Sequence, residues 1–207
     1  MEIKDKGFIM KEIMILGNGV SRQRDDIKKI INNYKKEIVV CNDACFEYIH
    51  HKIDYVFSVH LYHALKAFYL KKMKKLNYKI ITNKKLQKKD MLLIEFDWNK
   101  NTIYEFDWKL IYNQEINEYI FDYLFGMKLD DILNEFISFN EYGGYCTGNE
   151  AIKHLIKEGY DKFILVGFDF GGLDIYKGNE IMPGNNFISQ FNEIKNKNKN
   201  IIFEIIK

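Results

Sequence analysis

Residues 12–21 of the chain read Glu-Ile-Met-Ile-Leu-Gly-Asn-Gly-Val-Ser, and they decide the fold class. A short apolar run stops at a Gly-Asn-Gly turn, which is typical of a buried strand that ends abruptly. Further apolar runs follow along the chain and alternate with segments in which apolar residues recur at helical spacing. This alternation predicts a single Rossmann-like α/β domain, with a mostly parallel sheet and helices on both faces. The predicted strands are residues 12–16, 37–41, 55–59, 78–82, 162–166 and 201–206.

The chain of 207 residues has the length of one domain, and we expect residues 1–207 to form it. Its variable part is the middle. Two short strands that could pair as a hairpin are predicted within residues 91–112, followed by a helix over residues 115–139 that breaks near Gly126. Residues 91–140 are therefore a candidate lid over a binding site, or a segment that packs on the sheet.

Composition excludes several classes of protein. The net charge of +2 is nearly balanced, so there is no strong signal for a nucleic-acid partner, and the lysine run at residues 71–75 is interpreted as a solvated helix end. No apolar stretch approaches the roughly 20 residues of a membrane span. The odd set of three cysteines and the apparent lack of a leader suggest free thiols in a reducing, cytoplasmic protein. Homo-oligomerisation stays open.

The Gly17–Ser21 turn is the strongest candidate for a nucleotide site. Its glycines let a ligand approach the backbone, amides at the following helix start favour an anion, and Asn18 offers an amide to a sugar or base. Ser21 is expected to cap that helix. Arg22 stands where the dinucleotide fingerprint has its third glycine, and the turn is not a Walker loop. The alternative interpretation is a plain strand-to-helix turn.

Other polar residues follow the remaining strands, whose carboxyl ends share one edge of a parallel sheet. Asn42 follows the second strand and is a candidate ligand contact, with Asp43 as a helix N-cap. His60 follows the third strand as a candidate base, and His63 lies one helical turn later. Asp169 follows the strand at residues 162–166, where it would bind a hydroxyl or Mg²⁺ or form a turn.

A second glycine-rich segment runs from Tyr142 to Asn149 and leads into a predicted helix. Its amides are also expected to hold an anion. Together with Gly17-Asn18-Gly19-Val20-Ser21, Cys41-Asn42 and the stretch from Glu158 to Phe170, this segment resembles bacterial sialyltransferases of the α-2,3/α-2,8 lipooligosaccharide type. The related 6-hydroxymethylpterin diphosphokinase-like domains have a similar start and a similar strand end. The resemblance covers about the first 45 residues and roughly residues 140–172.

The resemblance implies which residues hold the cytidine nucleotide of a CMP-sugar donor. They are Asn18, Gly19, Asn42, Thr147 and Gly148, to which the turn chemistry adds Gly17, Ser21 and Asp169. Tyr142 or Tyr145 would lie near the leaving phosphate. Val20 replaces the proline of the family, and no histidine follows His154, although the family places its base in the loop after Asp169. His60 is the expected replacement base.

The sequence thus predicts a nucleotide-sugar-dependent glycosyltransferase that acts on a glycan or another small acceptor. Two alternatives stay open. A Mg²⁺-dependent pterin diphosphokinase would use Asp169 as a metal ligand. A protein that kept the fold but lost catalysis would bind a nucleotide and leave it unchanged. No cofactor is predicted with certainty, and Mg²⁺ stays open as one.

Overall fold

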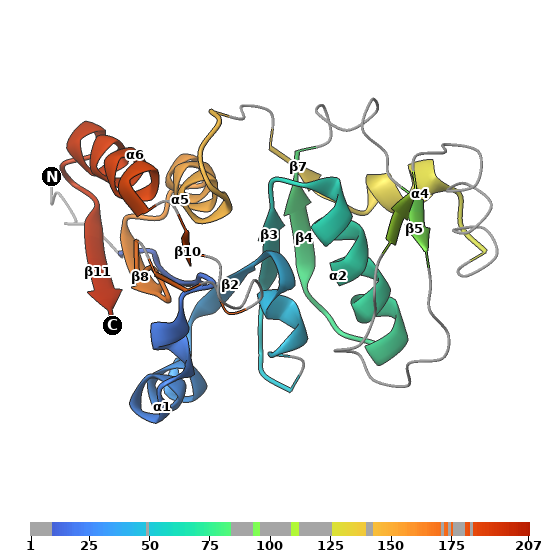
Figure 1. The fold of residues 1–207 in the computed structure, drawn as a ribbon, viewed down its shortest axis with the longest axis horizontal. Helices are drawn as coiled ribbons and strands as arrows, with labels where there is room; N and C mark the ends of the chain where they lie inside the picture. Colours follow the sequence, from blue (N-terminus) through green and yellow to red (C-terminus); the bar gives the residue numbers. More distant parts are fainter. Residues whose placement is uncertain are drawn as a thin grey trace, which may run out of the picture.

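A computed structural model of the chain has an all-parallel sheet of seven strands, in the order β11-β8-β1-β2-β3-β4-β7 (Figure 1). The structure describes residues 10–48, 50–83, 93–95, 109–111, 126–139, 143–170, 172–173, 175, 181–182 and 184–207. The predicted α/β class is confirmed. Within these ranges, no helix is both long and apolar enough to cross a membrane.

Six of the seven strands of the main sheet lie close to their predicted positions. Those of the main sheet are β1 (Glu12–Leu16), β2 (Glu37–Cys41), β3 (Tyr55–Ser58), β4 (Lys79–Thr82), β7 (Ile137–Ser138), β8 (Lys162–Val166) and β11 (Ile202–Ile206). Two antiparallel pairs stand apart from it: β5 (Leu93–Glu95) with β6 (Lys109–Ile111), and β9 (Gly172–Leu173) with β10 (Ile181–Met182). The first pair confirms the hairpin expected within residues 91–112.

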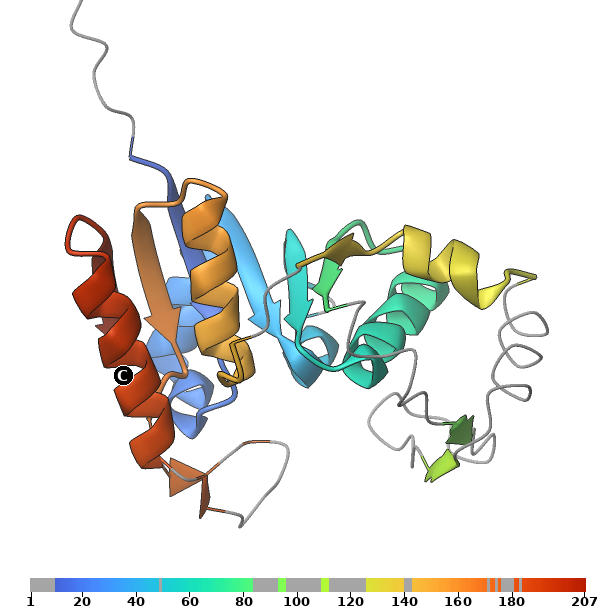
Figure 2. The ribbon, with the colours of Figure 1, turned by 90° about the horizontal axis from the view of Figure 1, so that it is seen from above.

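Helices cover both faces of the sheet (Figures 1 and 2). They are α1 (Asp25–Asn33), α2 (Leu61–Lys74), α4 (Leu129–Asn134), α5 (Thr147–Lys157) and α6 (Gly184–Lys197), with 3₁₀ helices η1 (Val20–Gln23) and η2 (Asn42–Phe46). Side chains of α1, α2 and α4 share one apolar core with one face of the sheet, and those of α5 and α6 share a second core with the other. Burial on both faces explains why the central strands are continuous apolar runs.

The middle of the chain differs from the prediction. Instead of one helix over residues 115–139, the described part holds the short helix α4 and the strand β7, which pairs with Ile81 and Thr82 of β4. Phe139 stacks on Phe57 of β3 with ring centroids 4.9 Å apart, and Phe136 packs against Phe68 of α2. Packing of these two aromatic rings outweighs the helical spacing. Most of the lid expected at residues 91–140 lies outside the described residues.

The order of the strands reverses between β1 and β8, and this places a switch point there. From β1 the chain adds β2, β3, β4 and β7 on one side, whereas β8 and β11 lie on the other. The amide of Gly17 donates to the carbonyl of Val166 (2.8 Å), and the amide of Gly19 donates to that of Gly167 (2.9 Å). In open α/β sheets, ligands bind beyond the carboxyl ends of the strands at such a point.

The opposite, amino edge of the sheet is tied together by paired side chains. Glu37 accepts hydrogen bonds from the hydroxyls of Tyr55 (3.2 Å) and Tyr160 (2.5 Å), and Glu12 pairs with Lys162 (2.9 Å). Burial, followed by the charge of Glu12, raises the pKa of Tyr34, which donates to that carboxylate. The amino edge is therefore held together by side-chain hydrogen bonds and ion pairs.

We predict that Gly17→Ala destabilises the protein by about 1–3 kcal/mol, the usual range for overpacking. A Cβ at this position would lie 2.7 Å from the carbonyl oxygen of Gly167, so backbone would have to move. Gly143→Ala is the control, because its Cβ would first meet the flexible end of Lys153. Urea unfolding of both variants measures the difference, and equal stabilities would contradict this account of the switch point.

Candidate functional site

The carboxyl edge of the sheet brings together several residues that the sequence singled out. Asn18 follows β1, Asn42 follows β2, His60 follows β3, Asp169 follows β8, and Thr147 begins α5. Two contacts join these segments directly: Asn42 with Thr147, and Ser21 with Asp169. Parallel strands present their carboxyl ends at one edge, so residues distant in sequence converge here.

Asn18 carries a buried acceptor for which the described residues supply no partner. Its side-chain oxygen Oδ1 makes no hydrogen bond within the described part of the chain, while its backbone carbonyl accepts the amide of Ile175 (3.0 Å). An unsatisfied buried carbonyl costs about 1–3 kcal/mol, so such groups are rare and call for an explanation. A ligand that donates a hydrogen bond at this point would satisfy Asn18.

Asn42 is held in a conformation that few residue types tolerate. Its φ angle is +51°, in the left-handed region, which asparagine accepts better than most residues. The side-chain amide donates to the hydroxyl of Thr147 at 3.2 Å. This contact joins the end of β2 to the first turn of α5. Both groups can also donate to or accept from a ligand.

The glycines of the site are explained by protein packing alone. A Cβ at Gly19 would overlap the Asp169 carboxylate and lie 2.6 Å from the carbonyl oxygen of Gly167. A Cβ at Gly148 would lie 2.7 Å from the ring of Phe168. These positions exclude side chains because the β1 turn, the β8 turn and α5 pack closely. It stays a prediction that Gly19 and Gly148 also lie close to a bound ligand.

Ser21 and Asp169 bind each other, which corrects the expected role of Ser21 as a helix cap. Ser21 lies inside η1, and α1 begins only at Asp25. The Ser21 amide donates to Oδ2 of Asp169 (3.0 Å), and its hydroxyl donates to Oδ1. Asp169 thus fixes the path of the Gly-Asn-Gly turn with both oxygens. Among the described residues, no cluster of three or more His, Cys, Asp or Glu side chains could hold a metal ion.

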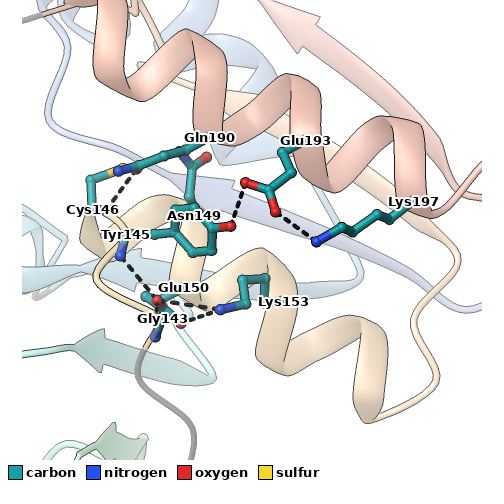
Figure 3. Close-up of polar contacts among 9 residues, drawn as sticks. All are labelled: Gly143, Tyr145, Cys146, Asn149, Glu150, Lys153, Gln190, Glu193 and Lys197. Carbon is teal, nitrogen blue, oxygen red and sulfur yellow. Dashed lines mark hydrogen bonds and ion pairs between the residues drawn. The ribbon is translucent and has the colours of Figure 1, made fainter.

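Three amides of the loop before α5, which was expected to hold an anion, are paired within the protein (Figure 3). The amides of Gly143 and Tyr145 donate to Oε1 of Glu150 (2.8 and 3.1 Å), and the amide of Cys146 donates to Oε1 of Gln190 (3.0 Å). Glu150 is buried and pairs with Lys153 (3.2 Å). These three donors are therefore already paired with a carboxylate and an amide oxygen, and binding of an anion by the rest of the loop stays a prediction.

Tyr145 is anchored to α6. Its hydroxyl donates to Oε2 of Glu193 (2.6 Å), which in turn pairs with Lys197 (2.6 Å), and Lys153 lies over its ring (Figure 3). The hydrogen bond to Glu193 raises the pKa of Tyr145. This arrangement joins the loop before α5 to α6, and a contact of Tyr145 with a leaving phosphate stays a prediction. Tyr142, the other predicted phosphate contact, lies outside the described residues.

His60 is the exposed residue that precedes α2. Its backbone amide donates to Oγ of Ser58 (3.1 Å), and the Ser58 hydroxyl donates back to the His60 carbonyl (2.8 Å). Desolvation and, to a lesser degree, the neighbouring His63 lower the pKa of His60. The ring centroids of the two histidines are 6.3 Å apart. His60 does lie at the predicted edge, and its role as a base stays a prediction.

Asp43 and His63 form a pair that the sequence analysis did not foresee. Oδ1 of Asp43 lies 2.8 Å from Nδ1 of His63, and Nζ of Lys66 donates to Oδ2 (3.0 Å). Burial opposes ionisation of Asp43, but the hydrogen bond and charge of His63 and then Lys66 outweigh it and lower the pKa of Asp43. The signal available in the sequence was an aspartate after one strand and a histidine after the next.

Comparison with known proteins adds no relative. No protein-family profile matches the chain, and no characterised protein matches its sequence significantly.

We predict that Asp169→Ala lowers the free energy of unfolding by about 1.5–3 kcal/mol, the range for a hydrogen bond to a charged group. The reason is the loss of both bonds to Ser21. In a double-mutant cycle with Ser21→Ala, the two effects should not add, because the residues share one interaction. Denaturant unfolding of the parent, the two single variants and the double variant measures the coupling energy. Strict additivity would show that the contact does not contribute to stability.

Proposed function

We propose that the chain is a nucleotide-sugar-dependent glycosyltransferase that binds its nucleotide at the carboxyl edge, between the turns after β1 and β2. The observation that carries this proposal is the buried side-chain oxygen of Asn18 at the switch point of the sheet, which has no hydrogen-bond partner in the described part of the chain. Asn42 and Thr147 lie on the neighbouring turn and helix as a second polar contact. These are three of the residues that the resemblance to sialyltransferases assigns to the nucleotide.

The chemistry of the site suits a nucleoside. Asn18 offers an acceptor, which fits a ribose hydroxyl or the exocyclic amine of a base. Cytosine has such an amine, and the sialyltransferase resemblance favours a CMP-sugar among nucleotide sugars. Asn42 and Thr147 can exchange their mutual hydrogen bond for bonds to a ligand at little cost, because both hold donors and acceptors.

Glycosyl transfer also makes two demands on the site. As the nucleotide leaves, positive charge develops on the sugar, and the attacking hydroxyl of the acceptor must lose a proton. The family supplies a histidine from the loop after the strand that corresponds to β8, but no histidine follows His154 here. The histidines at the end of β3 and the start of α2 lie on the same edge of the sheet and can take over that task.

The phosphoryl-transfer alternative has less support. It needs Asp169 as a Mg²⁺ ligand, and both oxygens of that carboxylate already accept hydrogen bonds from Ser21. Mg²⁺ would also require further oxygen ligands near it.

We expect CMP to raise the melting temperature of the protein more than CDP, UDP, GDP or ATP does, because a ligand stabilises the state that binds it. Incubation with a panel of CMP-, UDP- and GDP-sugars should then release CMP alone. A shift with CMP but no release from any CMP-sugar would identify a binding protein instead. Mg²⁺-dependent conversion of ATP to AMP with a pterin would identify the diphosphokinase.

We predict that Asn18→Ala weakens CMP binding by roughly 2- to 12-fold, which corresponds to the loss of about 0.5–1.5 kcal/mol for one neutral hydrogen bond. Asn42→Gly should act similarly, and glycine is chosen because alanine would be strained at the positive φ angle. Asn32→Ala, on the exposed side of α1, is the control. Isothermal titration calorimetry measures the affinities, and parental binding by both site variants would place the nucleotide elsewhere.

A further inference from the structure

We infer that His63 accepts the proton of the attacking hydroxyl, and that Asp43 positions it for this role. The inference rests on the proposed glycosyl transfer and assigns its base. It differs from the sequence-based expectation, which placed the base at His60. The arrangement of Asp43, His63 and Lys66 across η2 and α2 carries the argument.

The contact between Asp43 and His63 selects one form of the imidazole. Oδ1 of Asp43 lies 2.8 Å from Nδ1 of His63, and an ionised carboxylate only accepts hydrogen bonds. Nδ1 of the neutral ring must therefore carry the proton, which leaves the lone pair on Nε2. A carboxylate that fixes the tautomer and orientation of a histidine, and stabilises the imidazolium that forms, is a recurring device in enzymes.

Lys66 keeps the carboxylate in its charged form. Its ammonium donates to Oδ2 of Asp43 at 3.0 Å, and the Asp43 side chain is 19% exposed. Despite burial, the contacts with His63 and then with Lys66 lower the pKa of Asp43. Each oxygen of the carboxylate thus has one partner from α2, so the dyad is rigid before any substrate arrives. Preorganisation of this kind removes the need to orient the base during the reaction.

His60 lacks such support. Among the described residues, no carboxylate lies within ion-pairing distance of its ring, whereas His63 has Asp43. Desolvation and the nearby His63 lower the pKa of His60, which weakens it as a proton acceptor. His60 is also exposed, while the His63 side chain is 23% exposed and fixed on one side.

The dyad adjoins the proposed nucleotide site through the backbone. Asp43 directly follows Asn42, and both belong to η2 at the carboxyl end of β2.

In the proposed step, the acceptor oxygen forms a bond to the anomeric carbon and gives its proton to Nε2 of His63. The bond from that carbon to the nucleotide phosphate breaks, and its electron pair leaves with the phosphate. The imidazolium later returns its proton to solvent.

We expect His63→Ala to lower kcat by about 10²- to 10⁴-fold, the span of general bases, with little change in KM for the CMP-sugar or in affinity for CMP. Added imidazole should restore part of this turnover, because it can occupy the space of the lost ring. His51→Ala, an exposed histidine away from the carboxyl edge, is the matched control and should retain the parental rate. A purely structural role of His63 predicts a lower melting temperature and no rescue.

Asp43 is tested as a positioning residue. Asp43→Ala is combined with Lys66→Met. Removal of Asp43 alone would take this carboxylate away from a lysine that is charged and buried. The double variant should have a kcat at least about tenfold lower than the parent. Added imidazole should not rescue it, because the His63 ring is present but wrongly oriented. The neutral His63 ring should be protonated on Nδ1 in the parent by ¹⁵N NMR, and should lose this preference in the double variant.

The outcomes separate the two proposals. If the parent releases no nucleotide from any sugar donor, the proposed function fails, and the assignment of a base fails with it. If the parent is active but His63→Ala keeps its rate, or His60→Ala shows the loss and the imidazole rescue instead, only the assignment of His63 is overturned. An Nε2-protonated neutral ring in the parent would overturn the role of Asp43.

Discussion

The close approach of two peptide units, at Gly17 and Gly167, is the constraint on which the candidate site depends. Here the backbones of β1 and β8 leave the sheet in contact, with hydrogen bonds from Gly17 to Val166 and from Gly19 to Gly167. No Cβ fits between them. The approach brings Asp169 onto the amide and hydroxyl of Ser21, which sets the path of the first turn and the position of Asn18 within it.

The sequence was sufficient to predict the strands of the central sheet, because a parallel strand buried on both faces is a continuous apolar run. It was not sufficient for β7. That strand has only two residues, Ile137 and Ser138, and its pairing depends on an edge of β4 and on Phe139 stacking against Phe57. Neither partner is local in sequence, so the helical spacing around it was misleading.

The same reasoning applies to the site. The placement of Asn18 and Asn42 at one edge of the sheet was predictable, because the carboxyl ends of parallel strands meet there. The use of the loop amides by Glu150 and Gln190 was not, since it depends on how α5 packs against α6. The pair of Asp43 and His63 was missed for a similar reason. The sequence does not indicate which side chains contact each other when several polar residues follow neighbouring strands at one edge.

The pairing of β1 with β8 also has a consequence for how the chain acquires its structure. β1 ends at Leu16, and one of its two neighbours in the sheet, β8, begins only at Lys162. Closing so long a loop is slow, since its entropy is lost before the contact forms. During translation, the edge of β1 that pairs with β8 therefore stays uncovered until β8 has been made. The site at the ends of β1 and β2 exists only after β8 has left the ribosome and docked.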